Sequence, residues 1–130
     1  MEDKLIHKEL SYKIRGIIFL IHNELGQYRN EKQYGDALEY RLKEEKIKYE
    51  REKVLPISFE GEHPGRNRVD FLIDDKIILE LKHTPSLTRD NYFQCLRYLV
   101  TLKLDLGFLV NFKTRYLIIK RVLNPQNLAK

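Results

Sequence analysis

Asp70, Glu80 and Lys82 are the residues of this sequence whose types and spacing are best suited to chemistry. They lie in two short segments, 68–73 and 76–82, whose apolar and β-branched residues are typical of buried strands. Buried strands seldom carry charges without a reason, because ionised groups are costly to remove from water. Two carboxylates can bind a hard divalent cation through oxygen, and a nearby ammonium can position or activate a water molecule. The pattern therefore suggests a metal-dependent site.

Strand geometry sets a condition on this hypothesis. Residues two apart share a face of a strand, so Glu80 and Lys82 point to the same side. Asp70 joins them only if the strands are linked by an odd number of residues or carry a bulge. We expect a three-residue loop over 74–76, which places Asp70 opposite Glu80, with its two aspartates as turn residues and not ligands. Taken alone, Asp-x9-Glu-x-Lys is a weak signal, since a strand with a solvated charged face also produces it.

Apolar periodicity and turn residues predict the elements that position these side chains. Helices are expected over residues 4–25, 30–46 and 88–103, and strands over 48–59, the hairpin 68–83, 106–112 and 116–122. The order α-α-β-β-β-α-β-β predicts the α/β class, more narrowly an α+β mixed sheet with helices on its faces. Pro56 marks the first strand as edge-like. Residues 1–123 are expected to form one domain, followed by a polar, frayed tail at 124–130.

Composition narrows the classes of protein and partner. The single cysteine, Cys95, excludes an internal disulfide and a cysteine-based zinc site, and the four histidines lack zinc spacing. The charged start and the absence of a long apolar segment predict a soluble, cytoplasmic protein with no membrane partner. A net charge of +5 favours a polyanionic partner, although each basic cluster is equally consistent with a solvated face.

Several short motifs carry a family resemblance through their joint order and spacing. In sequence order they are Leu25-Gly26, Glu31-x-x-Tyr34, Arg68-x-Asp70, Glu80-Leu81-Lys82, Gln94-x-x-x-Tyr98 and Gly107-Phe-Leu-Val-Asn111-Phe112. Together they resemble the pattern of the GxxExxY proteins, a branch of the PD-(D/E)xK nuclease-like superfamily, over about residues 10–122. Two positions depart from that pattern: Tyr28 replaces the opening glycine, and Val69 replaces the proline before the first acid.

The resemblance implies a restriction-endonuclease-like core and a nuclease that hydrolyses the phosphodiesters of DNA or, less favoured, RNA through a metal-activated water. By position, Asp70, Glu80 and the backbone carbonyl of Leu81 would bind Mg²⁺ (or Mn²⁺). Lys82 would orient or help to deprotonate the attacking water. Glu31 corresponds to the helical acid of the superfamily and would hold a metal-bound water or a second metal.

Three further residues are candidates for substrate binding. Gln94 and Tyr98 are four apart on one helix face, and the resemblance implies that they line the site. The alternative is a polar helix face with a packed tyrosine, which is equally consistent with the sequence. Arg68 would clamp a phosphate or pair with a neighbouring acid. Tyr34 lies on the apolar stripe of its helix and is expected in the core.

Two other functions remain open at this point. One is a non-catalytic nucleic-acid-binding or accessory protein that keeps the nuclease fold, which the small size of the chain favours. The other is a protein-interaction module whose charged hairpin face is only solvated. For a nuclease, one site cuts one strand per engagement, so cleavage of both strands would require a homodimer.

Overall fold

The computed structural model describes residues 6–128, and its elements follow the predicted order with one short helix added at the end. The helices are α1 (Lys8–Leu25), α2 (Glu31–Glu44), α3 (Arg89–Leu102) and α4 (Pro125–Leu128). The strands are β1 (Tyr49–Val54), β2 (Arg68–Ile73), β3 (Ile77–Lys82), β4 (Leu106–Asn111) and β5 (Ile118–Leu123). The start of the first predicted helix, before residue 6, lies outside the described residues.

The strands form one mixed sheet in the order β1-β2-β3-β4-β5. The pairs β1–β2, β2–β3 and β4–β5 are antiparallel, whereas β3 and β4 are parallel. A parallel pair needs a crossover connection, and α3 provides it. β1 is an edge strand, as Pro56 predicted. β3 occupies the centre of the sheet, where a charged side chain has little access to water.

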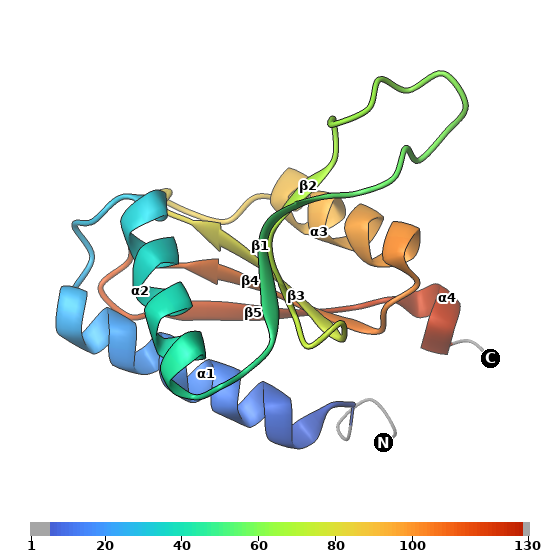
Figure 1. Cartoon of the computed structure of the whole chain (residues 1–130). Helices are drawn as coiled ribbons and strands as arrows, with labels where there is room; N and C mark the ends of the chain where they lie inside the picture. The colour runs from blue at the N-terminus through green and yellow to red at the C-terminus, as the bar shows by residue number, and fades with distance from the viewer. Residues whose placement is uncertain (1–5, 129–130) are drawn as a thin grey trace.

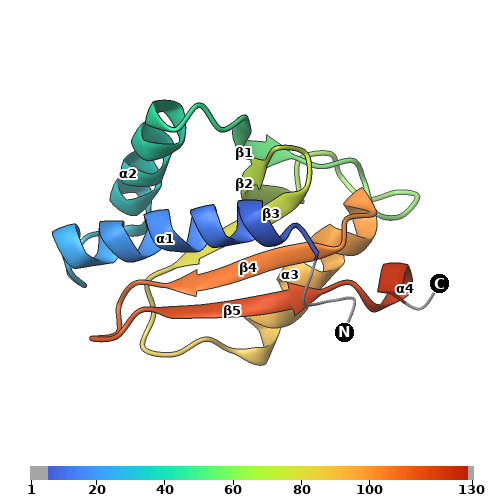
Figure 2. The same ribbon diagram turned by 90° about the horizontal axis from the view of Figure 1, so that it is seen from below.

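Helices cover both faces of the sheet (Figures 1 and 2). α1 and α2 pack on one face, and α3 packs on the other. The alternation along β3 shows the division: Leu79 belongs to the core under α1 and α2, and the adjacent Ile78 belongs to the core under α3. The fold class predicted from the sequence, an α+β mixed sheet, is therefore confirmed.

The β2–β3 hairpin has the predicted three-residue connection. The paired residues are Phe71 with Leu79 and Ile73 with Ile77, which leaves residues 74–76 as the loop. Both aspartates of this loop have positive φ, 52° for Asp74 and 55° for Asp75, a region that Asp tolerates better than most residues. Their carboxylates pair with lysines of the surface and take no part in the candidate site.

Two helix N-termini are fixed by reciprocal side-chain caps. Asn30 accepts a hydrogen bond from the Gln33 backbone N–H, and the Gln33 side chain accepts one from the Asn30 N–H. Thr88 and Asn91 form the same arrangement at the start of α3. The Asn30 cap was predicted from the sequence, and it fixes the position of Glu31 as the first residue of α2.

No helix within residues 6–128 has the length and apolar character needed to cross a membrane.

The first strand is shorter than predicted. We expected it over 48–59, but β1 ends at Val54 and its pairing stops after the Leu55 N–H donates to the Asn67 carbonyl. Pro56 has no N–H with which to continue the ladder. The chain then leaves the sheet as a long loop that extends from the end where β2 begins (Figure 1).

The tail does not begin as a frayed segment. Asn124 is 1% exposed, and its side-chain amide donates to the carbonyls of Leu104, at 3.0 Å, and Leu99, at 3.4 Å. Its backbone N–H bonds to the Asp105 carbonyl, and α4 follows. Composition alone could not show this, because a polar residue that anchors a turn looks like any polar tail residue.

Replacing Asn124 with alanine should lower the free energy of unfolding by about 1–3 kcal/mol, because the Leu104 carbonyl loses its side-chain donor and the Leu99 carbonyl keeps only its backbone donors. Urea denaturation of Asn124→Ala measures this loss. Gln126→Ala is the control, since its side chain is exposed and should change stability by less than about 0.5 kcal/mol. Equal stability of the two variants would contradict the anchoring role.

Candidate active site

Asp70 and Glu80 meet where β2 and β3 begin to separate. The ladder ends with the Phe71–Leu79 pair, and one more step of the same register places Asp70 opposite Glu80. Two hydrogen bonds from backbone to side chain join the strands here. The Asp70 N–H donates to Glu80 Oε2 at 3.3 Å, and the Leu81 N–H donates to Asp70 Oδ2 at 2.7 Å. Carboxylates thus accept bonds that backbone carbonyls accept in a regular ladder.

The carboxyl group of Glu80 is buried beside a like charge. Its residue is 3% exposed, and burial raises the pKa of Glu80 to about 9, with a further contribution from the charge of Asp70. The ammonium of Lys82 acts in the opposite direction and lowers the pKa of Glu80. Without metal, the Glu80 carboxyl is therefore protonated at neutral pH, and a bound divalent cation would favour its ionised form.

The donor atoms present fit a hard cation that retains water. Within residues 6–128, no three His, Cys, Asp or Glu side chains converge closely enough to bind a metal by themselves. Asp70 and Glu80 supply two carboxylates, and the backbone carbonyl of Leu81 lies in the same stretch of β3. One or two carboxylates completed by carbonyl and water oxygens match the preference of Mg²⁺.

Lys82 reaches towards α3 from the end of β3. Its Nζ donates to Gln94 Oε1 at 3.3 Å, so the two residues singled out from the sequence are in contact. Tyr98, one turn further along α3, is buried on the same side of the sheet. Burial raises the pKa of the Tyr98 hydroxyl, and the nearby charge of Glu80 adds to this effect. Lys82 and Tyr98 are therefore close enough to the Glu80 carboxyl to interact with it electrostatically, and Gln94 contacts Lys82.

Glu31 approaches the site from the opposite face. Its Oε2 accepts a hydrogen bond from the His83 N–H at 3.2 Å, which ties the start of α2 to the end of β3. Glu31, Asp70 and Leu81 are among the residues that line a small hollow of about 150 Å³, called here the α2 hollow. Glu80 is not part of its lining. The structure thus brings Asp70 near both acids, while Glu31 and Glu80 lie on different sides of β3.

Two other residues have positions that bear on the sequence hypotheses. Arg68, at the start of β2, is largely exposed, and its guanidinium lies 3.6 Å from the Glu52 carboxylate. Tyr34 is fully buried, stacks on Phe112 at 4.1 Å between ring centroids, and donates its hydroxyl hydrogen to the Gly26 carbonyl. The prediction that Tyr34 belongs to the core is confirmed.

Arg51, which was not among the predicted site residues, also lines the α2 hollow. From the sequence it is one of several cations in a basic stretch. The available signal was a glycine in the interior of a predicted helix, Gly35, followed by acids at Asp36 and Glu39. An interior glycine in a helix usually has a packing reason, and here the reason is the Arg51 guanidinium.

Comparison with known proteins gives one positive result. A family model of the PD-(D/E)XK nuclease superfamily matches residues 8–122, which is most of the chain. The match covers every candidate site residue. No curated protein and no solved structure gave a significant match.

Proposed function

Because this chain belongs to the PD-(D/E)XK nuclease superfamily, we propose that it is a metal-dependent nuclease that hydrolyses the phosphodiester bonds of DNA. One observation carries the proposal. The carboxylates of Asp70 and Glu80 are held together at the mouth of a buried hairpin, with Lys82 on the same strand. The mixed sheet with helices on both faces is consistent with the restriction-endonuclease-like fold of this superfamily.

Each residue of the site has a role that its contacts support. Asp70, Glu80 and the Leu81 carbonyl would hold Mg²⁺ or Mn²⁺, which when bound would lower the pKa of a water and offset charge on the scissile phosphate. Lys82 would orient that water and stabilise the charge that develops on the phosphate. Glu31, which lines the α2 hollow with Asp70, would accept a hydrogen bond from water there.

Residues around this centre would bind the substrate. The Lys82 ammonium donates a hydrogen bond to the Gln94 side chain and would donate to a phosphate oxygen when substrate binds. Tyr98 would support Gln94 from the next turn of α3. Arg68 is exposed two residues before Asp70, in reach of a backbone phosphate. The net charge of +5 favours a phosphate backbone as partner, and DNA is our preferred substrate.

Within the superfamily, we assign the chain to the GxxExxY branch. Glu31 and Tyr34 carry the signature, and both lie in the first turn of α2. Tyr34 is buried and fixes the preceding loop through Gly26, whereas Glu31 faces the α2 hollow. The signature therefore joins one structural and one functional residue on a single helical turn.

The nuclease activity is tested by incubating plasmid and labelled oligonucleotides with the protein in Mg²⁺, Mn²⁺ or EDTA. We expect cleavage only with metal, and a loss of about 10²-fold or more in Asp70→Asn. Asp74→Asn is the matched control, because it makes the same chemical change on the same hairpin at a turn position where Asn is well tolerated. Binding of nucleic acid without cleavage, in every metal, would instead identify an accessory protein.

A further inference from the structure

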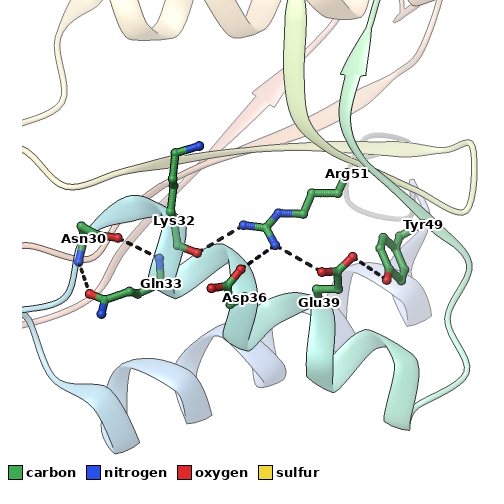
Figure 3. Close-up of polar contacts among 7 residues, drawn as sticks. All are labelled: Asn30, Lys32, Gln33, Asp36, Glu39, Tyr49 and Arg51. Carbon is green, nitrogen blue, oxygen red and sulfur yellow. Dashed lines mark hydrogen bonds and ion pairs between the residues drawn. The ribbon is translucent and has the colours of Figure 1, made fainter.

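The Arg51 side chain donates hydrogen bonds to acceptors on successive turns of α2 (Figure 3). Its Nη1 donates to Asp36 Oδ1 at 2.7 Å and to Glu39 Oε1 at 3.2 Å. Its Nη2 donates to the backbone carbonyl of Lys32 at 3.2 Å. The acceptors lie on one face of α2, and the planar guanidinium presents donors to all three at once.

Gly35 makes room for this contact. A Cβ at this position would lie 2.6 Å from Arg51 Nη2, closer than atoms of this kind approach one another. Glycine is among the poorest helix formers, so its presence inside α2 calls for a local reason. The close approach of the guanidinium supplies that reason.

The underside of the guanidinium is also fixed. Arg51 pairs with Phe71 across β1 and β2, and its guanidinium carbon lies 5.7 Å from the centre of the Phe71 ring. The Arg51 side chain is 20% exposed, whereas that of its partner Asp36 is 72% exposed. The ion pair with Asp36 therefore adds little to stability, whereas the second partner, Glu39, is only 30% exposed. Together these contacts fix the position of α2 relative to β1.

That geometry bears directly on Glu31. The carbonyl that Arg51 holds belongs to Lys32, the next residue in the chain. On its other side, the Glu31 carboxylate accepts a hydrogen bond from the N–H of His83, the residue that follows β3. The first turn of α2 is thus held between β1 and β3, and the α2 hollow with Asp70 lies between these two attachments.

We propose that Arg51 is a positioning residue that acts through Glu31, setting the distance of the Glu31 carboxylate from Asp70. This inference rests on the nuclease function proposed above, in which Glu31 takes part. In this proposal Arg51 acts through α2 and is not itself a ligand of the metal or the substrate. If Arg51 only stabilised the fold, its replacement would lower cleavage equally with and without Glu31. If Arg51 positions Glu31, its replacement should lower cleavage mainly when Glu31 is present.

A double-mutant cycle between Arg51→Gln and Glu31→Ala separates these two roles. We expect Arg51→Gln to lower kcat/KM about tenfold in the otherwise unchanged protein, because a small misplacement of a site residue is costly. In the Glu31→Ala background, the same change should cost less than about twofold. Arg51→Lys should restore only part of the loss, since one ammonium cannot serve three separated acceptors. Equal losses in the two backgrounds would overturn the proposal.

Arg41→Gln is the matched control. Arg41 lies on α2 itself and pairs with Glu24 of α1, and it is not among the residues that line the α2 hollow. This variant removes an arginine ion pair of α2 but leaves the hydrogen bond from Arg51 to the Lys32 carbonyl unchanged. We expect near-normal kcat/KM for this variant, and a loss as large as that of Arg51→Gln would count against a specific role.

The His83 amide gives a readout that does not depend on activity. Its hydrogen bond to Glu31 should open when α2 shifts, so its hydrogen exchange measured by NMR should be about tenfold faster in Arg51→Gln than in Arg41→Gln. Unchanged exchange would overturn the role of Arg51 whether or not the protein cleaves DNA. Absence of cleavage with changed exchange would instead count against the nuclease function alone.

Gly35→Ala tests the same idea without removing Arg51, should Arg51→Gln fail to fold. The new methyl group displaces the guanidinium while improving the helix propensity of α2. We expect an unchanged or higher Tm together with faster exchange of the His83 amide and reduced kcat/KM. A more stable variant with unchanged activity and exchange would show that the guanidinium position does not matter.

Discussion

Replacing Lys82 with methionine is expected to lower kcat for DNA cleavage by about 10²–10³-fold while metal binding persists. Methionine keeps the length and apolar stem of the side chain but removes the ammonium that would orient the water and offset charge on the phosphate. Asp70 and Glu80, the expected metal ligands, remain in place. Single-turnover cleavage and calorimetric titration with Mn²⁺ measure the two properties separately.

Lys76→Met is the control for this experiment. Lys76 lies in the loop of the same hairpin and pairs with Asp74 at the surface, so the substitution removes an equal charge outside the site. It should leave cleavage and metal binding close to those of the unchanged protein. Similar cleavage by Lys82→Met and the unchanged protein would remove Lys82 from the mechanism and favour a protein that only binds nucleic acid.

Local sequence signals predicted much of the scaffold that presents these residues. The length of the 74–76 loop followed from the requirement that Asp70 and Glu80 share a side, and the register confirms it. Asn30 was recognisable as a cap, and the apolar stripe placed Tyr34 in the core. These features depend on neighbours in sequence or on strand periodicity, which a sequence displays directly.

Features that depend on distant partners were not predicted. The acceptors of Arg51 lie on α2, which is a separate element earlier in the sequence. In the sequence, Arg51 is one of several basic residues in the same stretch, and nothing local distinguishes it from them. Asn124 is anchored by carbonyls at the end of α3 and beyond. The placement of Glu31 and Glu80 on different sides of β3 also required the structure, because strand alternation does not locate a helix residue. The catalytic and ligand roles of the site residues stay predictions.

Glu80→Gln should make the metal-free protein more stable at alkaline pH and abolish metal-dependent cleavage. Burial and the charge of Asp70 raise the pKa of Glu80 from 4.5 to about 9. Between these values the folded protein binds one proton more than the unfolded chain, so stability is full below the unfolded pKa and falls as pH rises towards 9. The loss approaches about 1.4 kcal/mol per pH unit for one proton. Glutamine cannot ionise, so Glu80→Gln should not lose stability in this way as the pH rises.

The same protonation opposes metal binding, because a carboxylate must lose its proton to act as a ligand. The affinity of the unchanged protein for Mg²⁺ should therefore rise by up to about tenfold per pH unit from pH 6 to 8, with release of a proton. Urea denaturation of both proteins with and without Mg²⁺, from pH 5 to 9, measures the two effects together. Added metal should restore alkaline stability only where Glu80 is present. Parallel stability curves for the two proteins across this range would show that Glu80 is ionised without metal, and that its burial beside Asp70 does not set the pH dependence of the site.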